Sequence, residues 1–296
     1  MTNNQKTALM IVTVAIAALI MIATVWSIYF FDASEPAKTE QTTASESTSD
    51  TETSASETTS DKPSDTEKPK KMIALTFDDG PSARYTHKIL DLLEKYDAKA
   101  TFFVLGNMLS VQTADEIKRA VSLGCEIGNH SYSHPSLTEL SDRDILEQIT
   151  STNEKIKTYS GCDYECKLYR PPYGNIDRGV MEALYENGVY MHAILWSSDS
   201  RDWEYKNSYT NGNISRDQAV QGAFETVVRE TSEGTVILMH DIQEITPDIL
   251  ELILKKYTDE GYSFVTVSEL FDFENRTDKD SYFYRYRSTT SILPVK

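Results

Sequence analysis

The 296-residue sequence predicts an α/β fold: a distorted (β/α) barrel with about seven parallel strands, preceded by an N-terminal transmembrane helix and a disordered linker. Short apolar runs rich in β-forming residues alternate with amphipathic helical stretches from residue 72 to residue 275. This alternation favours a parallel sheet covered by helices, because parallel strands need long crossover connections. About seven strands in roughly 200 residues fit a barrel better than a wide open sheet.

Composition and charge exclude several classes of protein. Hydrophobic residues make up 40% of the chain, which is enough for a core and rules out wholesale disorder. The formal net charge is −17, from 46 acidic residues against 29 lysines and arginines. Nucleic acid is therefore not an expected partner, because phosphate binding needs clustered cations. Three cysteines are too few for a disulfide scaffold or a four-cysteine zinc site.

Residues 1–31 predict a cytoplasmic stub and a membrane anchor. Residues 8–31 are uncharged, and as a helix they span roughly 36 Å, more than the ~30 Å hydrocarbon core of a bilayer. Lys6 precedes this run and Asp32 follows it, so the positive-inside rule keeps the N-terminus in the cytoplasm and places the rest outside the cell. A cleaved signal peptide is the alternative, but the run is too long for one and Phe31 stands where a small residue is needed.

Residues 32–71 predict a disordered linker. Seventeen of these 40 positions are Ser or Thr, and the segment contains no aliphatic residue larger than Ala. Such a stretch cannot bury enough apolar surface to offset its ordering entropy. We expect it to be a mobile tether that holds the domain of residues 72–275 away from the membrane.

The elements of the barrel follow from the apolar runs and the helical spacing. The predicted strands are residues 72–77, 100–105, 125–128, a short strand near Leu168, 190–196, 235–240 and 264–267. The predicted helices are residues 85–96, 114–123, 142–159, 177–186, 216–231 and 247–259. The third helix follows Ser141, with Asp144 three residues on as an imperfect capping box. In such barrels the chemistry lies at the carboxyl ends of the strands, where this chain places its unusual polar residues.

Two adjacent carboxylates, Asp78 and Asp79, follow the first predicted strand and precede Gly80-Pro81. A turn is the alternative interpretation, because Asp-Gly and Gly-Pro are ordinary turn formers. However, adjacent carboxylates at a strand end repel each other unless a cation or a shared proton relieves them. Different tasks for the two acids would resolve this repulsion.

A pair of histidines, His130 and His134, follows the third predicted strand. If this stretch forms one helical turn, both imidazoles point the same way and can chelate one divalent ion. A pair at this spacing is weak evidence by itself. With Asp79 as the natural third ligand, the set becomes two His and one Asp, a facial arrangement with open positions for water and substrate.

Three further segments end predicted strands with polar residues, although an ordinary loop or core residue would explain each one alone. Arg170-Pro-Pro-Tyr-Gly is stiff, so a following amide N–H can be held to receive an oxyanion, and Arg170 can hold a carboxylate ionised. Residues 196–203 combine two acids with two tryptophans, and exposed tryptophans stack on sugar rings. His240 with a carboxylate partner is a candidate proton donor to a leaving group.

Together these five segments resemble, in order and spacing, the motifs of the NodB-like polysaccharide deacetylases, carbohydrate esterase family 4, which include membrane-anchored peptidoglycan N-acetylglucosamine deacetylases. The matching segments are Thr-Phe-Asp-Asp-Gly-Pro at 76–81, His-Ser-x-Ser-His-Pro at 130–135, Arg-Pro-Pro-Tyr-Gly at 170–174, Asp-Ser-x-Asp-Trp at 199–203 and Leu-x-His at 238–240. The resemblance implies a distorted (β/α) barrel and metal-dependent removal of acetyl groups from sugars, by hydrolysis of an amide bond that is not a peptide bond.

The resemblance also implies a role for each motif residue. The expected metal ligands are Asp79, His130 and His134, with zinc as the expected ion and cobalt or manganese as alternatives. The expected catalytic residues are Asp78 as general base, Arg170 to keep Asp78 ionised, the Tyr173 N–H in the oxyanion hole, His240 as general acid and Asp202 to orient His240. The residues expected to shape the acetyl pocket are Trp203, Leu238 and Tyr173.

Topology suggests the substrate. On the outer face of a cell membrane the nearest N-acetylated polymer is peptidoglycan, so deacetylation of its N-acetylglucosamine is the leading hypothesis. Chitooligosaccharide deacetylation and xylan O-deacetylation are alternatives within the same family. A non-catalytic envelope glycan-binding module is an alternative of another class, and the complete set of base, acid and ligand residues speaks against it.

Three features lie outside the motifs. Residues 204–217 predict a polar loop that could line the glycan groove. Cys162 and Cys166 could pair outside the cell, although three intervening residues can strain such a bridge and Cys125 would remain odd. Residues 276–296 form a C-terminal tail to which no motif assigns a role.

Overall fold

A curled parallel sheet surrounded by helices forms the folded part of the chain. The structure is a computed structural model that describes residues 71–275, 284–288 and 291–294. The strand order is β10-β9-β5-β4-β3-β2-β1-β7-β6, and β8 pairs with the first half of β1. Seven parallel strands, from β5 to β6 along this order, curl into a half-barrel, which confirms the predicted α/β class and parallel sheet.

All seven predicted strands and six predicted helices are present with bounds that shift by a few residues, whereas the strands at 198–199, 284–288 and 291–294 and the helices at 202–210 and 267–271 were not predicted. The strands are β1 Lys71–Asp78, β2 Thr101–Val104, β3 Glu126–Asn129, β4 Leu168–Tyr169, β5 His192–Ile194, β6 Ser198–Asp199, β7 Val236–His240, β8 Tyr262–Val265, β9 Tyr284–Ser288 and β10 Ser291–Pro294. The helices are α2 Thr86–Lys95, α3 Ala114–Ser122, α4 Asp142–Ser160, α5 Arg178–Glu186, α6 Asp202–Thr210, α7 Arg216–Glu230, α8 Thr246–Asp259 and α9 Val267–Phe271.

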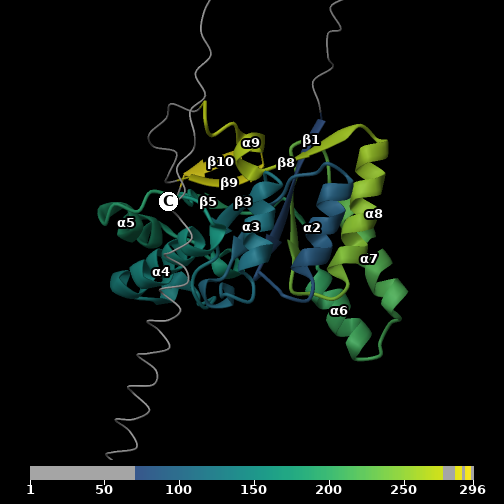
Figure 1. Cartoon of the computed structure of the whole chain (residues 1–296), viewed down its shortest axis with the longest axis horizontal. Coiled ribbons are helices and arrows are strands. Elements are labelled where there is room, and N and C mark those ends of the chain that lie inside the picture. Colours follow the sequence, from purple (N-terminus) through teal and green to yellow (C-terminus); the bar gives the residue numbers. More distant parts are fainter. Residues whose placement is uncertain (1–70, 276–283, 289–290, 295–296) are drawn as a thin grey trace, which may run out of the picture. The chain divides into compact units, whose positions relative to one another are not determined.

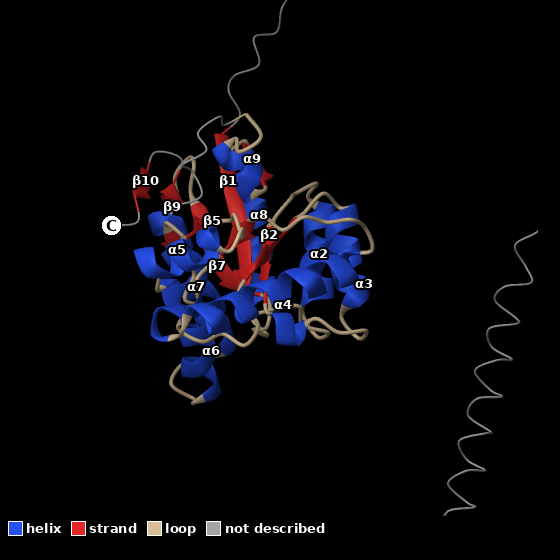
Figure 2. Cartoon of the chain, turned by 90° about the vertical axis from the view of Figure 1, so that its left-hand side faces the viewer, coloured by secondary structure: helices blue, strands red, loops and turns tan. Residues whose placement is uncertain are grey.

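The side chains of β1 alternate between the outer and the inner face of the sheet, and the two faces have different neighbours. Ile73, Leu75 and Phe77 point outward into the main core, which includes buried residues of α2, α3, α7 and α8. The alternate residues Ala74, Thr76 and Asp78 point to the inner face, since successive strand residues alternate. Ala74 packs in an apolar cluster with residues of α9, which lies at the end of the sheet where β1 begins (Figure 2). The inner face is therefore apolar at that end and polar at the carboxyl end.

Helices cover the outer face in one continuous row. α7 packs on α8, α8 on α2, α2 on α3, α3 on α4 and α4 on α5 (Figure 1). α4 begins after Ser141, whose hydroxyl accepts a hydrogen bond from the Asp144 N–H, as the predicted cap required, and it ends at Gly161 with φ 79°. α7 begins with a full capping box between Ser215 and Gln218.

The prediction of a polar loop over residues 204–217 is wrong, because Asp202–Thr210 forms helix α6. This segment lacks a regular apolar stripe, so the usual sequence signal of a helix is missing. Tertiary contacts stabilise it instead. Tyr205 packs against the main core, and its hydroxyl lies 3.1 Å from the Thr226 hydroxyl on α7, over Gly222.

The C-terminal tail adds to the sheet. β9 pairs in parallel with β5, with Ala193 opposite Arg285, and β10 pairs antiparallel with β9. The three cysteines are free thiols, so the structure does not contain the possible bridge between Cys162 and Cys166. The predicted membrane anchor and linker lie outside the described residues. Within those residues, no helix has the length and apolar character needed to cross a bilayer.

The cap of α4 gives a test of the fold. We expect Ser141→Ala to lower the free energy of unfolding by about 1 kcal/mol, because the first turn of the helix loses its side-chain acceptor. Ser151→Ala, within the same helix, is the matched control, and it should be neutral or slightly stabilising because Ala is the better helix former. Urea denaturation followed by circular dichroism measures both changes. Equal losses in the two variants would contradict the assigned cap.

Candidate active site

The carboxyl end of β1 carries the two predicted acids in different surroundings. Asp78 is the last residue of the strand and is only 3% exposed, whereas Asp79 begins the turn and is partly exposed. Asp79 has φ 74°, in the left-handed region that non-glycine residues rarely adopt. The change in backbone direction between the two residues sends their carboxylates to different neighbours.

Arg170 is the neighbour of Asp78. Its guanidinium is completely buried and donates to Asp78 Oδ1 at 2.8 Å and to the Thr76 hydroxyl at 2.7 Å. It also donates to the carbonyls of Ile194 and Leu195 and lies 4.1 Å from the centre of the Phe103 ring. Burial raises the pKa of the Asp78 carboxyl, and the Arg170 charge works against that rise. Arg170 therefore offsets part of the effect of burial on the Asp78 pKa, and its role as the partner that keeps Asp78 ionised stays a prediction.

Asp79 faces the two histidines. His130 Nε2 and His134 Nε2 each lie 3.6 Å from Asp79 Oδ1. One ligand atom from each of these three residues lies within 4.8 Å of the other two. His130 Nε2 is also 3.7 Å from Asp78 Oδ2, so the second acid lies directly beside the group. The structure thus brings all three predicted ligands to one point.

The loop that presents the histidines is not the helical turn suggested by their spacing. Ser131 and His134 both have positive φ angles, 68° and 64°. Local hydrogen bonds hold this shape: Asn129 Oδ1 accepts from the Ser131 N–H, and the Ser131 hydroxyl accepts from the His134 N–H. Gln148 on α4 accepts two more N–H groups of the loop. The imidazoles converge through a folded loop, so the predicted convergence is correct and the predicted helical turn is wrong.

His130 is held in the state that a metal ligand needs. Its Nδ1 lies 2.7 Å from the Arg170 carbonyl, an acceptor, so the hydrogen belongs on Nδ1 and the Nε2 lone pair is free. Burial lowers the pKa of His130 to about 3, which keeps the ring neutral. A second partner that fixes the tautomer is typical of ligating histidines.

The three side chains fit a divalent transition metal. Two neutral imidazoles and one carboxylate form a donor set found in catalytic zinc sites, with positions left for water and substrate. Asp79 Oδ1 is buried and has no hydrogen-bond partner among the described residues. An orphaned buried carboxylate oxygen needs a cation or a donor, because desolvation of such a group is costly. A bound cation would satisfy it.

His240 and Asp202 form a pair on the other side of Asp78. Asp202 is completely buried, and its carboxylate accepts from His240 Nδ1 at 2.7 Å, from the His240 backbone N–H and from the Thr246 hydroxyl. Burial alone would lower the pKa of His240, but Asp202, helped by Asp78 and Asp79, raises it to about 10. His240 therefore carries a proton near neutral pH, with Nε2 free to donate it.

The loop after β4 supplies one backbone donor. Tyr173 has φ 59° between Pro172 and Gly174, and its ring meets the His134 ring edge-on at 4.5 Å. Pro171 and Pro172 have no N–H, and the N–H groups of Gly174 and Asn175 donate to the carbonyls of Pro171 and Pro172. The Tyr173 N–H is thus the donor that this loop can offer beside the histidine group.

Two predicted pocket residues have different exposures. Leu238 on β7 is buried, and Trp203 is 43% exposed. A cavity of about 400 Å³ lies beside Tyr173 and is lined by Trp196, Asp199 and Glu230 among others, but not by Trp203 or Leu238. The role of these two residues in binding an acetyl group stays a prediction.

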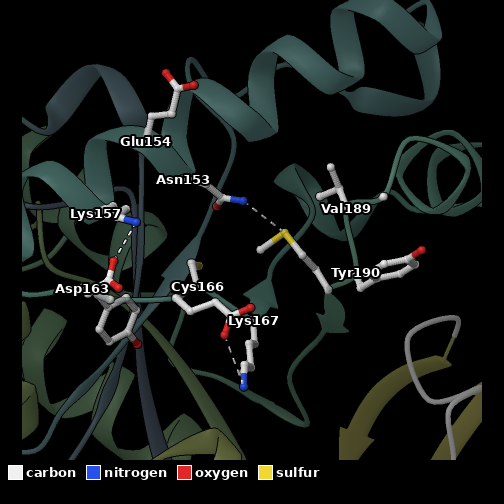
Figure 3. Close-up of a pocket in the computed structure, with 12 residues that line it drawn as sticks. Asn153, Glu154, Lys157, Asp163, Cys166, Lys167, Val189 and Tyr190 are labelled. Atoms are coloured by element: carbon white, nitrogen blue, oxygen red, sulfur yellow. Dashed lines mark hydrogen bonds and ion pairs between the residues drawn. The ribbon is translucent and has the colours of Figure 1, made fainter.

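A larger cavity lies far from these side chains. It has a volume of about 650 Å³ and lies at the amino ends of β4 and β5 (Figure 3). Four of its five charged residues pair with one another, Lys157 with Asp163 and Lys167 with Glu165. No predicted site residue lines it, so the size of a cavity does not locate the chemistry here.

Sequence reasoning missed several supporting residues. Thr76 bridges Arg170 to the Ile237 carbonyl, and its place two residues before Asp78 on the same strand face was a usable signal. Thr246 and Gln148 lie far from the motifs in sequence. Only the fold brings them to the site.

Metal binding tests the histidine group. We expect Asp79→Ala and His134→Ala to abolish or strongly weaken binding of zinc, because each removes one of three ligands. Asp78→Asn should keep most of the affinity, since Asp78 lies beside the group. Isothermal titration calorimetry of the purified domain measures the affinity for zinc. The control is His87→Ala, which removes an exposed histidine on α2. Wild-type affinity in His134→Ala would refute the assignment.

Comparison with known proteins agrees with this geometry. The family profile described as "Polysaccharide deacetylase" matches residues 65–192. The chain is 40% identical over 201 residues to the peptidoglycan-N-acetylmuramic acid deacetylase PdaC of Bacillus subtilis, covering 68% of this chain and 39% of PdaC. It is 37% identical over 204 residues to the peptidoglycan-N-acetylglucosamine deacetylase PgdA of Listeria monocytogenes, covering 69% of this chain and 40% of PgdA. The chain thus spans about two fifths of the length of these relatives.

A solved structure of similar length completes the comparison. A family 4 acetyl xylan esterase from Clostridium thermocellum, in complex with a cobalt ion, is 32% identical, with a TM-score of 0.63 over 75% of this chain and 100% of that chain. Fold, site geometry and sequence identity therefore agree, and this chain belongs to the polysaccharide deacetylase family, the NodB-like deacetylases of carbohydrate esterase family 4.

Proposed function

We propose that the chain hydrolyses N-acetyl groups of a cell-envelope polysaccharide, with N-acetylglucosamine of peptidoglycan as its substrate. One observation carries the proposal: an Arg-paired acid, a group of three ligands and a His–Asp pair meet at one end of the sheet. His130 Nε2 lies within 3.7 Å of both Asp78 and Asp79, which places a base beside the ligand group. Metal-assisted hydrolysis of an acyl group uses a base, a general acid and a cation together.

The chain's own residues have distinct tasks in this reaction. Asp78, ionised beside Arg170, removes a proton from the attacking water. The Tyr173 N–H donates a hydrogen bond to the acetyl carbonyl oxygen as it becomes an oxyanion. His240, charged and oriented by Asp202, then gives its Nε2 proton to the departing amine.

Asp79, His130 and His134 would hold a divalent cation, for which we propose zinc. When bound, such a cation polarises the acetyl carbonyl and acidifies water, which is worth several kcal/mol of transition-state stabilisation. Cobalt and manganese are the alternatives in the same donor set.

The names of the two similar peptidoglycan deacetylases favour a cell-wall substrate but differ in the sugar, N-acetylmuramic acid for one and N-acetylglucosamine for the other. We propose N-acetylglucosamine because the rim beside Tyr173 carries the acids Asp199 and Glu230. These carboxylates can accept hydrogen bonds from sugar hydroxyls, and the 3-hydroxyl is free in N-acetylglucosamine but blocked by the lactyl ether in muramic acid.

We also propose that the domain works outside the cell on a membrane anchor. The support is the uncharged run of residues 8–31 followed by a Ser/Thr-rich linker up to residue 71. Protease added to intact cells should remove the domain and leave a membrane-bound stub. Release of the full-length domain into the medium would indicate that the segment is cleaved.

Acetate release from purified peptidoglycan tests the activity. We expect the zinc-loaded protein to release acetate, and chelator to stop it. Asp78→Asn should lower kcat by about 10²- to 10⁴-fold, because it removes the base while metal content is kept. Mass spectrometry of muramidase digests then identifies which sugar has lost its acetyl group.

The same assay separates the competing functions. Acetate from xylan, or from chitooligosaccharides, with none from peptidoglycan would overturn the proposed substrate. Loss of acetyl from the muramic acid alone would overturn the choice of sugar. A metal-loaded protein that binds the glycan without releasing acetate would favour a non-catalytic binding module.

The pH profile tests the assignment of His240 as general acid. Asp202 raises the pKa of His240, so the protonated form persists up to the folded pKa and is lost as pH rises through it. Asp202→Asn removes this charge, and we expect the alkaline limb of the kcat profile to move to lower pH. Asp217→Asn, on the exposed start of α7, is the control. An unchanged alkaline limb in Asp202→Asn would exclude His240 as the titrating acid.

A further inference from the structure

One buried carboxylate at the site has no task in the scheme above. Asp241 follows His240 directly and is 1% exposed. Its Oδ1 has no hydrogen-bond partner among the described residues, and it is not one of the three grouped ligands. Burying a carboxylate oxygen without a hydrogen-bond partner costs free energy, so the burial of Asp241 calls for an explanation.

Asp241 ties three segments together through one hydroxyl. The Thr86 hydroxyl at the start of α2 donates to Asp241 Oδ2 at 2.6 Å and accepts the Ser82 N–H at 2.7 Å. Ser82 lies in the segment that follows Asp79-Gly80-Pro81. The end of β7 is thereby linked to the turn that leaves β1 and to the first turn of α2.

The same carboxylate fills the space beside Gly80. A Cβ placed on Gly80 would lie 2.1 Å from both carboxylate oxygens of Asp241, far inside van der Waals contact. Gly80 is not in the left-handed region, so contact with Asp241 is the reason for glycine here. On the other side, the Gly80 carbonyl accepts the Leu105 N–H at 3.0 Å. Residue 80 is therefore fixed from two directions.

This restraint acts on the strained residue next to it. Asp79 has φ 74°, a conformation that costs on the order of 1–3 kcal/mol and persists only where the surroundings enforce it. If residue 80 could shift, Asp79 could relax and move its carboxylate away from His130 and His134. Because the ligand group depends on that position, the contact between Asp241 and Gly80 bears directly on metal binding.

We propose that Asp241 is a positioning residue: packed on Gly80 and bonded to Thr86, it holds the Asp79 turn in the geometry that binds the metal. The catalytic part of this inference rests on the proposed function, but the metal-binding part does not. Supporting groups outside the ligand set commonly change metal affinity by about 10- to 100-fold, which sets the size of effect to expect.

Zinc titration of the purified domain tests the proposal. We expect Asp241→Ala to weaken zinc binding by about 10- to 100-fold. Asp241→Asn should retain most of the affinity, because the amide keeps the shape and can still accept from Thr86. Thr86→Val should weaken binding and Thr86→Ser should restore it. The matched control is Glu126→Gln, a half-buried acid bonded to Thr101 and Ser268 at the far end of the sheet.

A double-mutant cycle isolates the contact itself. Gly80→Ala alone should weaken zinc binding, because its methyl group displaces the carboxylate. In the Asp241→Ala background the same change should cost little further affinity, because the obstructing atoms are gone. Equal losses in both backgrounds, or wild-type affinity in Asp241→Ala, would overturn the proposal.

Two further measurements separate positioning from general stability. Thermal melting of the metal-free variants should show Asp241→Asn and Glu126→Gln folded, so affinity can be compared in folded protein. In the deacetylation assay at saturating zinc, Asp241→Ala should lower kcat with KM little changed. If wild-type protein proves inactive on every glycan, the proposed function fails while the zinc comparison still decides the role of Asp241.

Discussion

The buried ion pair between Arg170 and Asp78 is the interaction on which the rest of the site depends. Removing two charges from water costs several kcal/mol for each ion, so such a pair is stable only where further contacts offset the loss. Arg170 has them, because it also bonds to Thr76 and to two carbonyls after β5, and its plane lies on Phe103. Arg170, which follows β4, thereby connects β1 and β5 across the inner face of the sheet. Its bond to Asp78 Oδ1 leaves Asp78 Oδ2 directed toward His130.

The same surroundings give two imidazoles opposite protonation states. Burial, with a smaller effect of His134, lowers the pKa of His130 to about 3 although Asp79 and the Arg170 carbonyl act to raise it, so the ring stays neutral. His240 is also buried, but Asp202 faces it, and its pKa rises to about 10. Environment, not residue type, thus separates a metal ligand from a proton donor, which is a common way for one site to use acid and base chemistry together.

Much of this could be predicted from sequence, because strand patterning and motif residues are local properties. Seven of the ten described strands, six of the eight described α-helices and the meeting of Asp79 with His130 and His134 follow from them. Three features could not be predicted. The loop around His134 adopts its shape through Asn129 and Gln148, helix α6 lacks an apolar stripe and depends on packing against α7, and Asp241 gains its importance only from its contact with Gly80 across the fold.

Backbone strain shows why the features that could not be predicted are important for the site. Of the seven non-glycine residues with positive φ in the described part of the chain, five lie in the loops of the site: Asp79, Ser131, His134, Tyr173 and Arg201. Each such residue costs on the order of 1–3 kcal/mol, so the loops would relax if nothing held them. One restraint, the Ser131 hydroxyl, lies within a motif, but others come from outside the motifs, from the side chains of Asn129 and Gln148 and from the packing of Asp241. A substitution at one of these supports therefore acts on the site itself, although the residue touches neither substrate nor metal.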